Sequence, residues 1–137
     1  MANMTPSSST SGFDDWQDAL AARYPLARSA GGFGCFGGWF SILAHLFERL
    51  EAAAAQLPDE RRRDFKIEQI KQKLGYLVVY LSQEGTAEMT AAIDEAQNAA
   101  AVTCEVCGAS GELAARAGWI SVKCSRHENW SRFDDLV

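Results

Sequence analysis

Two pairs of metal-ligand residues near the end of this 137-residue chain constrain its fold more than any other feature. Two residues separate Cys104 from Cys107, and two separate Cys124 from His127. This spacing lets both side chains of a tight turn reach one ion, and the sixteen residues of segment 108–123 suffice for a hairpin that joins the halves. Three thiolates and one imidazole suit Zn²⁺ in a reducing compartment. The pattern therefore predicts one zinc ion held by these four side chains.

The predicted zinc is structural, because four protein ligands leave no position for water or a substrate. We expect Trp119 to cover one side of the site. The alternatives are a redox pair at Cys104 and Cys107, or four residues that are simply buried. A redox C-x-x-C normally follows a strand and opens a helix, whereas this one is expected to follow a helix and precede a strand. The sequence therefore favours a metal ligand set over a redox pair.

Two other side chains of metal-ligand type, Cys35 and His45, lie outside these pairs. Cys35 sits in a glycine-rich segment, and we interpret it as a small buried residue. A reactive thiol and a further thiol near the metal are its alternatives. His45 lies beside the apolar stripe of an expected helix, which favours a packed or half-exposed histidine over a ligand.

Charge and composition limit the compartment and the partners of the chain. The net charge of -5 and the pI near 5.0 argue against nonspecific binding to nucleic acid, which usually requires a basic surface. No apolar run approaches the ~20 residues that a membrane-spanning helix needs. Residues 1–12 are small and polar and lack the features of a secretion signal, so we expect a disordered leader and a cytoplasmic protein. In that reducing compartment, cysteines indicate metal ligands before disulfides.

Apolar periodicity predicts three helices. Steps of three and four residues place one apolar stripe along each of three segments: 13–24, 39–57 and 86–102. Pro25 is expected to end the first helix. The segment 29–38 holds five glycines and predicts a loop without a phosphate-binding lysine. The charged segment 59–64 is expected to form a solvated turn.

The segment 65–82 is ambiguous, because its apolar residues fit a helical period while its second half is rich in β-branched and aromatic residues. We favour a hairpin in which 65–71 and 76–82 pair across a turn, with a helix as the alternative. Two further short strands are expected at 112–115 and 119–124.

Together these elements predict an α+β fold with two or three helices packed on a β-hairpin and a zinc-ribbon-like module at the C-terminal end. The core is expected to span 13–102, and the module, at 103–137, is expected to pack on it within a single domain. The tail 125–137 is expected to form a short turn of helix that packs Trp130 and Phe133.

Three motifs occur in a fixed order: G-F-x-C-x-G-G-W at 32–39, F-K-I-x-Q-I-K-x-K-L-G at 65–75, and C-E-V-C-G followed by C-x-x-H at 104–127. In this order they resemble a group of small bacterial and phage-borne proteins, mostly uncharacterised, that end in a zinc-ribbon-like module. The resemblance covers roughly residues 31–130. It implies the hairpin at 65–82 and no established activity. Similar small acidic proteins often serve as immunity proteins that block a toxin, and this link rests on analogy alone.

The absence of catalytic motifs points to a binding function. A zinc deaminase needs H-x-E and P-C-x-x-C, and a zinc protease needs H-E-x-x-H; the chain has neither. We therefore expect a non-catalytic, zinc-stabilised protein that binds another protein, such as an immunity protein or inhibitor that neutralises a basic bacterial toxin. Four aromatic residues are the expected partner anchors, with core packing as their alternative: Phe33, Phe36, Trp39 and Trp119.

Two other functions stay open. The first is a zinc-ribbon accessory protein that binds nucleic acid, if the basic residues gather on one face: Arg61–Arg63, Lys66, Lys71, Lys73, Arg116, Lys123 and Arg126. The second is a metal-dependent hydrolase, which requires a zinc ion with an open, water-bearing position.

Overall fold

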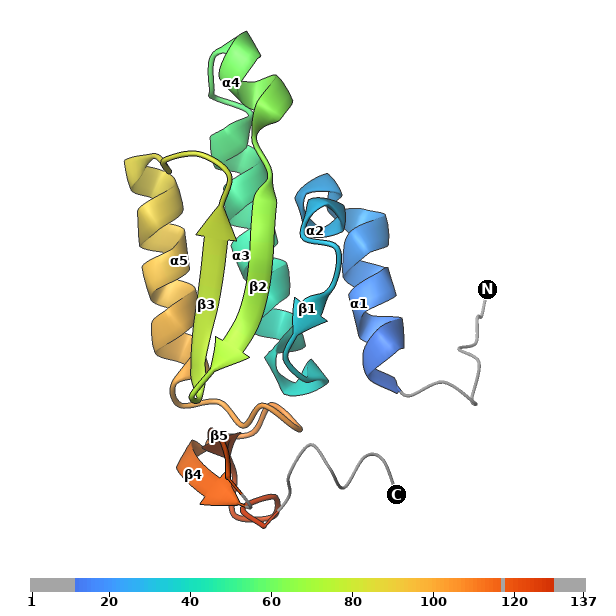
Figure 1. The fold of residues 1–137 in the computed structure, drawn as a ribbon, viewed down its shortest axis with the longest axis vertical. Helices are drawn as coiled ribbons and strands as arrows, with labels where there is room; N and C mark the ends of the chain where they lie inside the picture. The colour runs from blue at the N-terminus through green and yellow to red at the C-terminus, as the bar shows by residue number, and fades with distance from the viewer. Residues whose placement is uncertain (1–11, 117, 130–137) are drawn as a thin grey trace.

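Helices cover one face of a three-stranded sheet, and a two-stranded hairpin stands at one end of this assembly (Figure 1). The computed structural model describes residues 12–116 and 118–129. The predicted class, α+β with helices on a β-hairpin and a Cys/His module near the C-terminus, is confirmed. The predicted leader at 1–12, except for its last residue, and the predicted turn around Trp130 and Phe133 lie outside the described residues.

The three periodic segments form the long helices, and three short helices were not expected from the sequence: Pro25–Ser29, Gly37–Trp39 and Asp59–Asp64. Pro25 opens a second helix instead of simply ending the first, because a proline at the first helical position lacks only an N–H that has no helical partner. The expected turn at 59–64 is helical, with acidic residues in its first turn and arginines in its last, as the helix dipole favours. The helices are α1 (Gly12–Arg23), α2 (Pro25–Ser29), the 3₁₀ helix η1 (Gly37–Trp39), α3 (Phe40–Ala54), α4 (Asp59–Asp64) and α5 (Ala87–Ala100).

The glycine-rich segment is not a plain loop. It contributes the short strand β1 (Phe33–Gly34), which pairs in parallel with the next strand along the sheet. Gly31 and Gly32 have φ angles of 76° and 135°, which glycine adopts easily, and the chain bends there before β1 begins. A two-residue strand carries too little hydrophobic pattern to be recognised in the sequence.

The predicted hairpin is confirmed, with β2 (Ile67–Lys73) antiparallel to β3 (Tyr76–Leu81). Leu74 and Gly75 form the two-residue connection with φ angles of 52° and 90°, as a twist-compatible hairpin turn requires. The Gly75 N–H donates to Gln72 Oε1 at 2.8 Å. Strand order in the sheet is β1-β2-β3, which leaves β3 at one edge.

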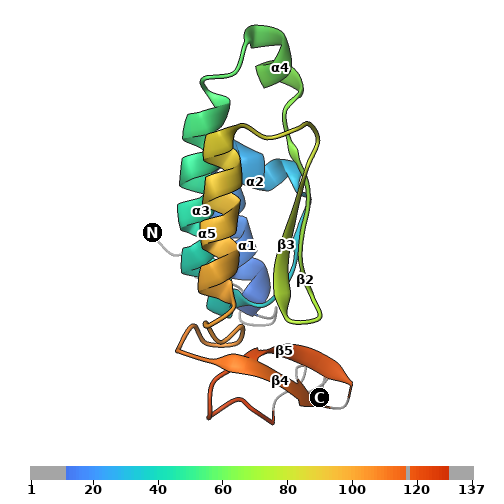
Figure 2. The same cartoon turned by 90° about the vertical axis from the view of Figure 1, so that its left-hand side faces the viewer.

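The core lies between this sheet and the helices, as Figure 2 shows from the side. Trp39, Leu43, Phe47 and Leu50 are fully buried, because they fall on one stripe that runs from η1 along α3. Thr86 caps α5 by accepting a hydrogen bond from the Met89 N–H at 3.2 Å. Among the described residues, no helix is both long and apolar enough to cross a bilayer.

The remaining strands, β4 (Glu112–Arg116) and β5 (Trp119–Lys123), form a separate antiparallel hairpin below the main sheet (Figure 1). Their predicted positions are confirmed to within one residue. The tip of the β2–β3 hairpin reaches this module. A Cβ atom on Gly75 would lie 2.2 Å from Leu113 Cδ1, so a larger residue at the tip would collide with β4.

Candidate metal centre

The four predicted ligands converge at the base of the β4–β5 hairpin. Cys104 and Cys107 precede β4, while Cys124 and His127 follow β5. Their donor atoms, three Sγ and one imidazole nitrogen, all lie within 4.8 Å of one another. The sequence prediction that these residues come together is therefore confirmed, and the set could hold a metal ion.

The separations between these donor atoms fit a tetrahedral shell. Two thiolates bound to a tetrahedral Zn²⁺ would lie about 3.8 Å apart, and a thiolate and an imidazole nitrogen about 3.5 Å. Cys107 Sγ is 3.7 Å from Cys124 Sγ. His127 Nδ1 is 3.8 Å from Cys104 Sγ and 3.2 Å from Cys124 Sγ. We interpret these distances as spacings between ligands of one ion.

Backbone hydrogen bonds give both ligand pairs their shape. The Gly108 N–H donates to the Cys104 carbonyl at 2.9 Å, and Gly108 takes a φ of 87° that suits glycine at such a turn. The Cys104 N–H donates to the Ala109 carbonyl at 2.6 Å. In the second pair, the His127 N–H donates to the Cys124 carbonyl at 3.0 Å. These turns aim the two side chains of each pair in one direction.

The electrostatics of the cluster favour a thiolate at Cys124, whereas the neighbouring thiols raise the pKa of Cys107. Burial raises the pKa of Cys124, but hydrogen bonds from His127 and from the Arg126 backbone outweigh it and lower the pKa to about 6. The guanidinium of Arg126 also lies near the first pair, with Nη2 3.8 Å from Cys107 Sγ. Three thiolates on a divalent ion would carry one net negative charge, which this arginine would partly offset.

A buried carboxylate joins the first ligand pair to the core. Glu105 is 1% exposed, and its two oxygens accept hydrogen bonds from the Phe36 N–H and from Gln72 Nε2, each at 3.0 Å. Its own carbonyl accepts from the Gly38 N–H at 2.7 Å. Burial raises the pKa of Glu105, although these bonds and the nearby charge of Lys123 act to lower it. The sequence alone does not predict this role of Glu105, although the position of a glutamate between two expected metal ligands could have indicated it.

Gly38 is required where the glycine-rich segment meets this ligand pair. A Cβ atom at this position would lie 2.2 Å from the Cys104 carbonyl oxygen and 2.5 Å from the Glu105 carbonyl carbon. Backbone atoms cannot move aside as the end of a flexible side chain can. The contact explains why a glycine stands next to Trp39.

Cys35 and His45 are not part of the cluster. Cys35 is buried, as predicted, and burial together with the Glu105 charge raises the pKa of its thiol far above the ordinary value. It therefore stays protonated and unreactive. His45 is exposed on α3, with Nε2 3.6 Å from Glu95 Oε1. This corrects the expectation of a packed or half-exposed histidine.

Two of the four predicted partner anchors belong to the core. Trp39 is fully buried and donates from Nε1 to the Thr103 carbonyl at 2.9 Å. Phe33 is 8% exposed and stacks at 5.6 Å, centroid to centroid, on Phe47. Their alternation with glycines suggested a presented loop, whereas β1 and η1 turn both rings inward. Phe36 and Trp119 are half-buried.

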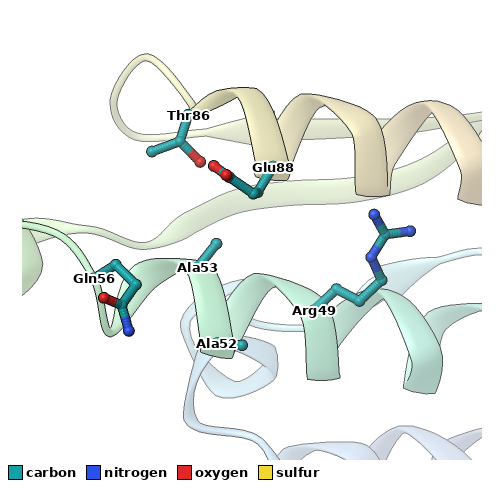
Figure 3. A pocket seen from close by; sticks show the side chains of 6 residues that line it. All are labelled: Arg49, Ala52, Ala53, Gln56, Thr86 and Glu88. Atoms are coloured by element: carbon teal, nitrogen blue, oxygen red, sulfur yellow. The ribbon is translucent and has the colours of Figure 1, made fainter.

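The groove between α3 and α5 holds about 380 Å³ (Figure 3). Arg49 and Glu88 are its charged lining residues, and they project from facing helices. The rest of the lining is small or uncharged: Ala52, Ala53, Gln56 and Thr86. This lining has no histidine, and the hydroxyl of Thr86 accepts the capping hydrogen bond from the Met89 N–H.

The fold and the cluster define an α+β protein with a Cys₃His group at the base of a C-terminal hairpin. No family model, curated protein or solved structure matches this chain. The resemblance to small bacterial and phage-borne zinc-ribbon proteins therefore stays a prediction.

Proposed function

We propose that this chain is a non-catalytic binding protein whose C-terminal module is stabilised by one Zn²⁺ ion. The observation that carries the proposal is the convergence of four donor atoms within 4.8 Å, with three of their six separations close to those of a tetrahedral site. Zinc is the proposed ion because thiolates and imidazole are its preferred ligands in structural sites. A reducing compartment, the cytoplasm, suits this role because it would keep the thiols free to bind.

The proposed role of the ion is structural. Four protein ligands fill a tetrahedral shell, so neither water nor a substrate has a position on the metal. A two-stranded hairpin is marginally stable by itself, and β4–β5 contributes little to the main core apart from Val122. Metal binding would supply the missing stability, as it does in other small metal-dependent modules.

Several observations weigh against the partners expected from the sequence. A basic protein, such as a toxin neutralised by an immunity protein, stays a prediction, but burial of Phe33 and Trp39 removes half of its expected anchors. The predicted basic face is also incomplete, because Lys123 is buried. Arg61 donates hydrogen bonds to Gln83 and Glu84 at the end of α4.

Metal analysis tests the proposal. Protein purified without added metal should contain one Zn²⁺ per chain, and Cys107→Ser should reduce the content to well below one because a ligand is lost. Cys35→Ala is the matched control, since it removes a cysteine outside the cluster and should retain the ion. Zinc-free wild-type protein would refute the structural site. An X-ray absorption spectrum that showed zinc with three protein ligands and one water molecule would favour the metal-dependent hydrolase.

A further inference from the structure

The outer face of the main sheet is uncovered. The helices pack against the opposite face, and no described helix or strand lies in front of β2 and β3 (Figures 1 and 2). We use the term outer sheet face for the side chains that alternate outward on these two strands: Gln69, Lys71, Lys73, Tyr76, Val78 and Tyr80.

Strand register sets these side chains beside one another. Lys73 lies opposite Tyr76, Lys71 opposite Val78, and Gln69 opposite Tyr80. Tyr76 is 58% exposed and Tyr80 is 44% exposed, so part of each side chain is accessible to a ligand. Lys71 Nζ lies 5.8 Å from the centroid of the Tyr80 ring.

This face differs in charge from the chain as a whole. The protein has a net charge of -5, yet the outer sheet face carries Lys71 and Lys73 and no carboxylate. Glu68, at the bulge beside Gln69, is an exposed acidic neighbour. Gly34 of β1 continues the face next to Lys71 without a side chain, which keeps the surface flat there. A flat surface with lysines between tyrosines is complementary to a polyanion that has aromatic rings of its own.

Single-stranded nucleic acid has this chemistry, because its bases are free to stack on aromatic side chains while its phosphates meet lysines. Duplex bases are already stacked and paired, so they would not reach the rings. Tyr76 and Tyr80 are four residues apart on one strand, a distance of about 13 Å along an extended chain. Two bases of one strand could therefore occupy the two rings.

We propose that the outer sheet face binds single-stranded nucleic acid, with bases stacked on Tyr76 and Tyr80 and phosphates beside Lys71 and Lys73. This inference rests on one part of the proposed function, namely that the chain is a binding protein. The metal content of each sample, measured separately, shows whether the zinc proposal has failed. The sequence-based expectation of a basic face missed the two tyrosines, although their alternation in 76–80 was visible once a hairpin was assumed.

Fluorescence anisotropy with labelled RNA and DNA strands of about 12 nucleotides and mixed sequence tests the proposal on the full chain. Binding should weaken about sevenfold when the salt concentration rises from about 50 to about 200 mM, if two phosphates are neutralised. Tyr76→Ala combined with Tyr80→Ala should weaken binding at least about tenfold, while the two corresponding changes to Phe should retain it. Lys71→Gln combined with Lys73→Gln should weaken binding and flatten the salt dependence.

The matched control removes two arginines from the helical side, Arg23→Gln with Arg28→Gln, and should bind like the wild type. All these positions except Lys71 are exposed, so circular dichroism should show unchanged folding. The proposal is overturned if neither strand binds at low salt, or if the tyrosine and lysine variants bind as well as the wild type. Binding of a labelled poly-glutamate peptide, with no binding of either strand, would also overturn it in favour of an acidic protein partner.

Discussion

Glu105 lies between two metal ligands in the sequence, yet its carboxylate faces the core. It accepts hydrogen bonds from Phe36 and Gln72, which are 69 and 33 residues away. A buried charge is costly unless it is paired and hydrogen-bonded, and here Lys123 lies nearby. This one side chain therefore ties the ligand pair to both the glycine-rich segment and the β2 strand.

We expect Glu105→Gln to lower the free energy of unfolding by about 1–3 kcal/mol, because the amide has one acceptor oxygen for two donors. The change also removes one carboxylate charge near the buried Lys123. Urea unfolding followed by circular dichroism measures the loss. Glu68→Gln, at an exposed position of β2, is the control and should change stability by less than about 0.5 kcal/mol. Equal effects from the two variants would contradict the role assigned to Glu105.

At the scale of elements, the contact between η1 and the first ligand pair determines how the module docks. Gly38→Ala should be strongly destabilising and should weaken zinc binding, because the added Cβ collides with the Cys104 carbonyl oxygen at 2.2 Å. Thermal unfolding and competition with a zinc-binding dye measure the two effects.

Gly85→Ala is the matched control for this change. Its Cβ would meet only side-chain atoms of Leu81 and Met89, the nearest at 3.1 Å, and these atoms can adjust. We expect a much smaller loss of thermal stability and unchanged zinc affinity. If Gly38→Ala binds zinc and unfolds like the Gly85 variant, the close backbone contact does not hold the module.

The elements that the sequence predicts well are those whose signal is local. The stripe of α3 repeats often enough to define a period, and β3 is rich in β-branched and aromatic residues. Short elements escaped this reasoning, because α2 and β1 have too few residues to show a period and depend on contacts with β2. The α4 helix was hidden by its charge, since its residues are all exposed.

The candidate site likewise has parts that the sequence predicts and parts that it does not. Four ligands could be predicted because each pair is set by a tight turn, and the hairpin between them is short. The burial of Phe33 and Trp39 could not, because it depends on how the glycine-rich segment folds against α1 and α3. The roles of Glu105 and of the outer sheet face could not be predicted either, because they depend on contacts between residues far apart in the sequence.

On the scale of the whole molecule, the main core and the Cys/His module should differ in their need for metal. Removal of zinc with a chelator should raise amide hydrogen exchange across 104–127, while the protected amides of α3 and α5 should change little. The physical reason is that α3 and α5 bury a large apolar core, whereas β4–β5 is a two-stranded hairpin.

Hydrogen exchange with mass spectrometry, measured before and after chelation, checks this expectation. Restoring Zn²⁺ should restore the protection, and Mg²⁺ should not, because it prefers oxygen ligands. Simultaneous loss of protection in all helices would mean that core and module form one cooperative unit. Unchanged exchange at 104–127 would show that the module needs no metal.

The position of Glu105 also bears on how the chain is made. During synthesis, the glycine-rich segment and the β2 strand leave the ribosome before residue 104 exists, so the Phe36 N–H and the Gln72 amide wait without their acceptor. A product that terminates early would lack this acceptor for both donors. The end of the core beside η1 would then stay open, so we expect this end to close only after the first ligand pair has been synthesised.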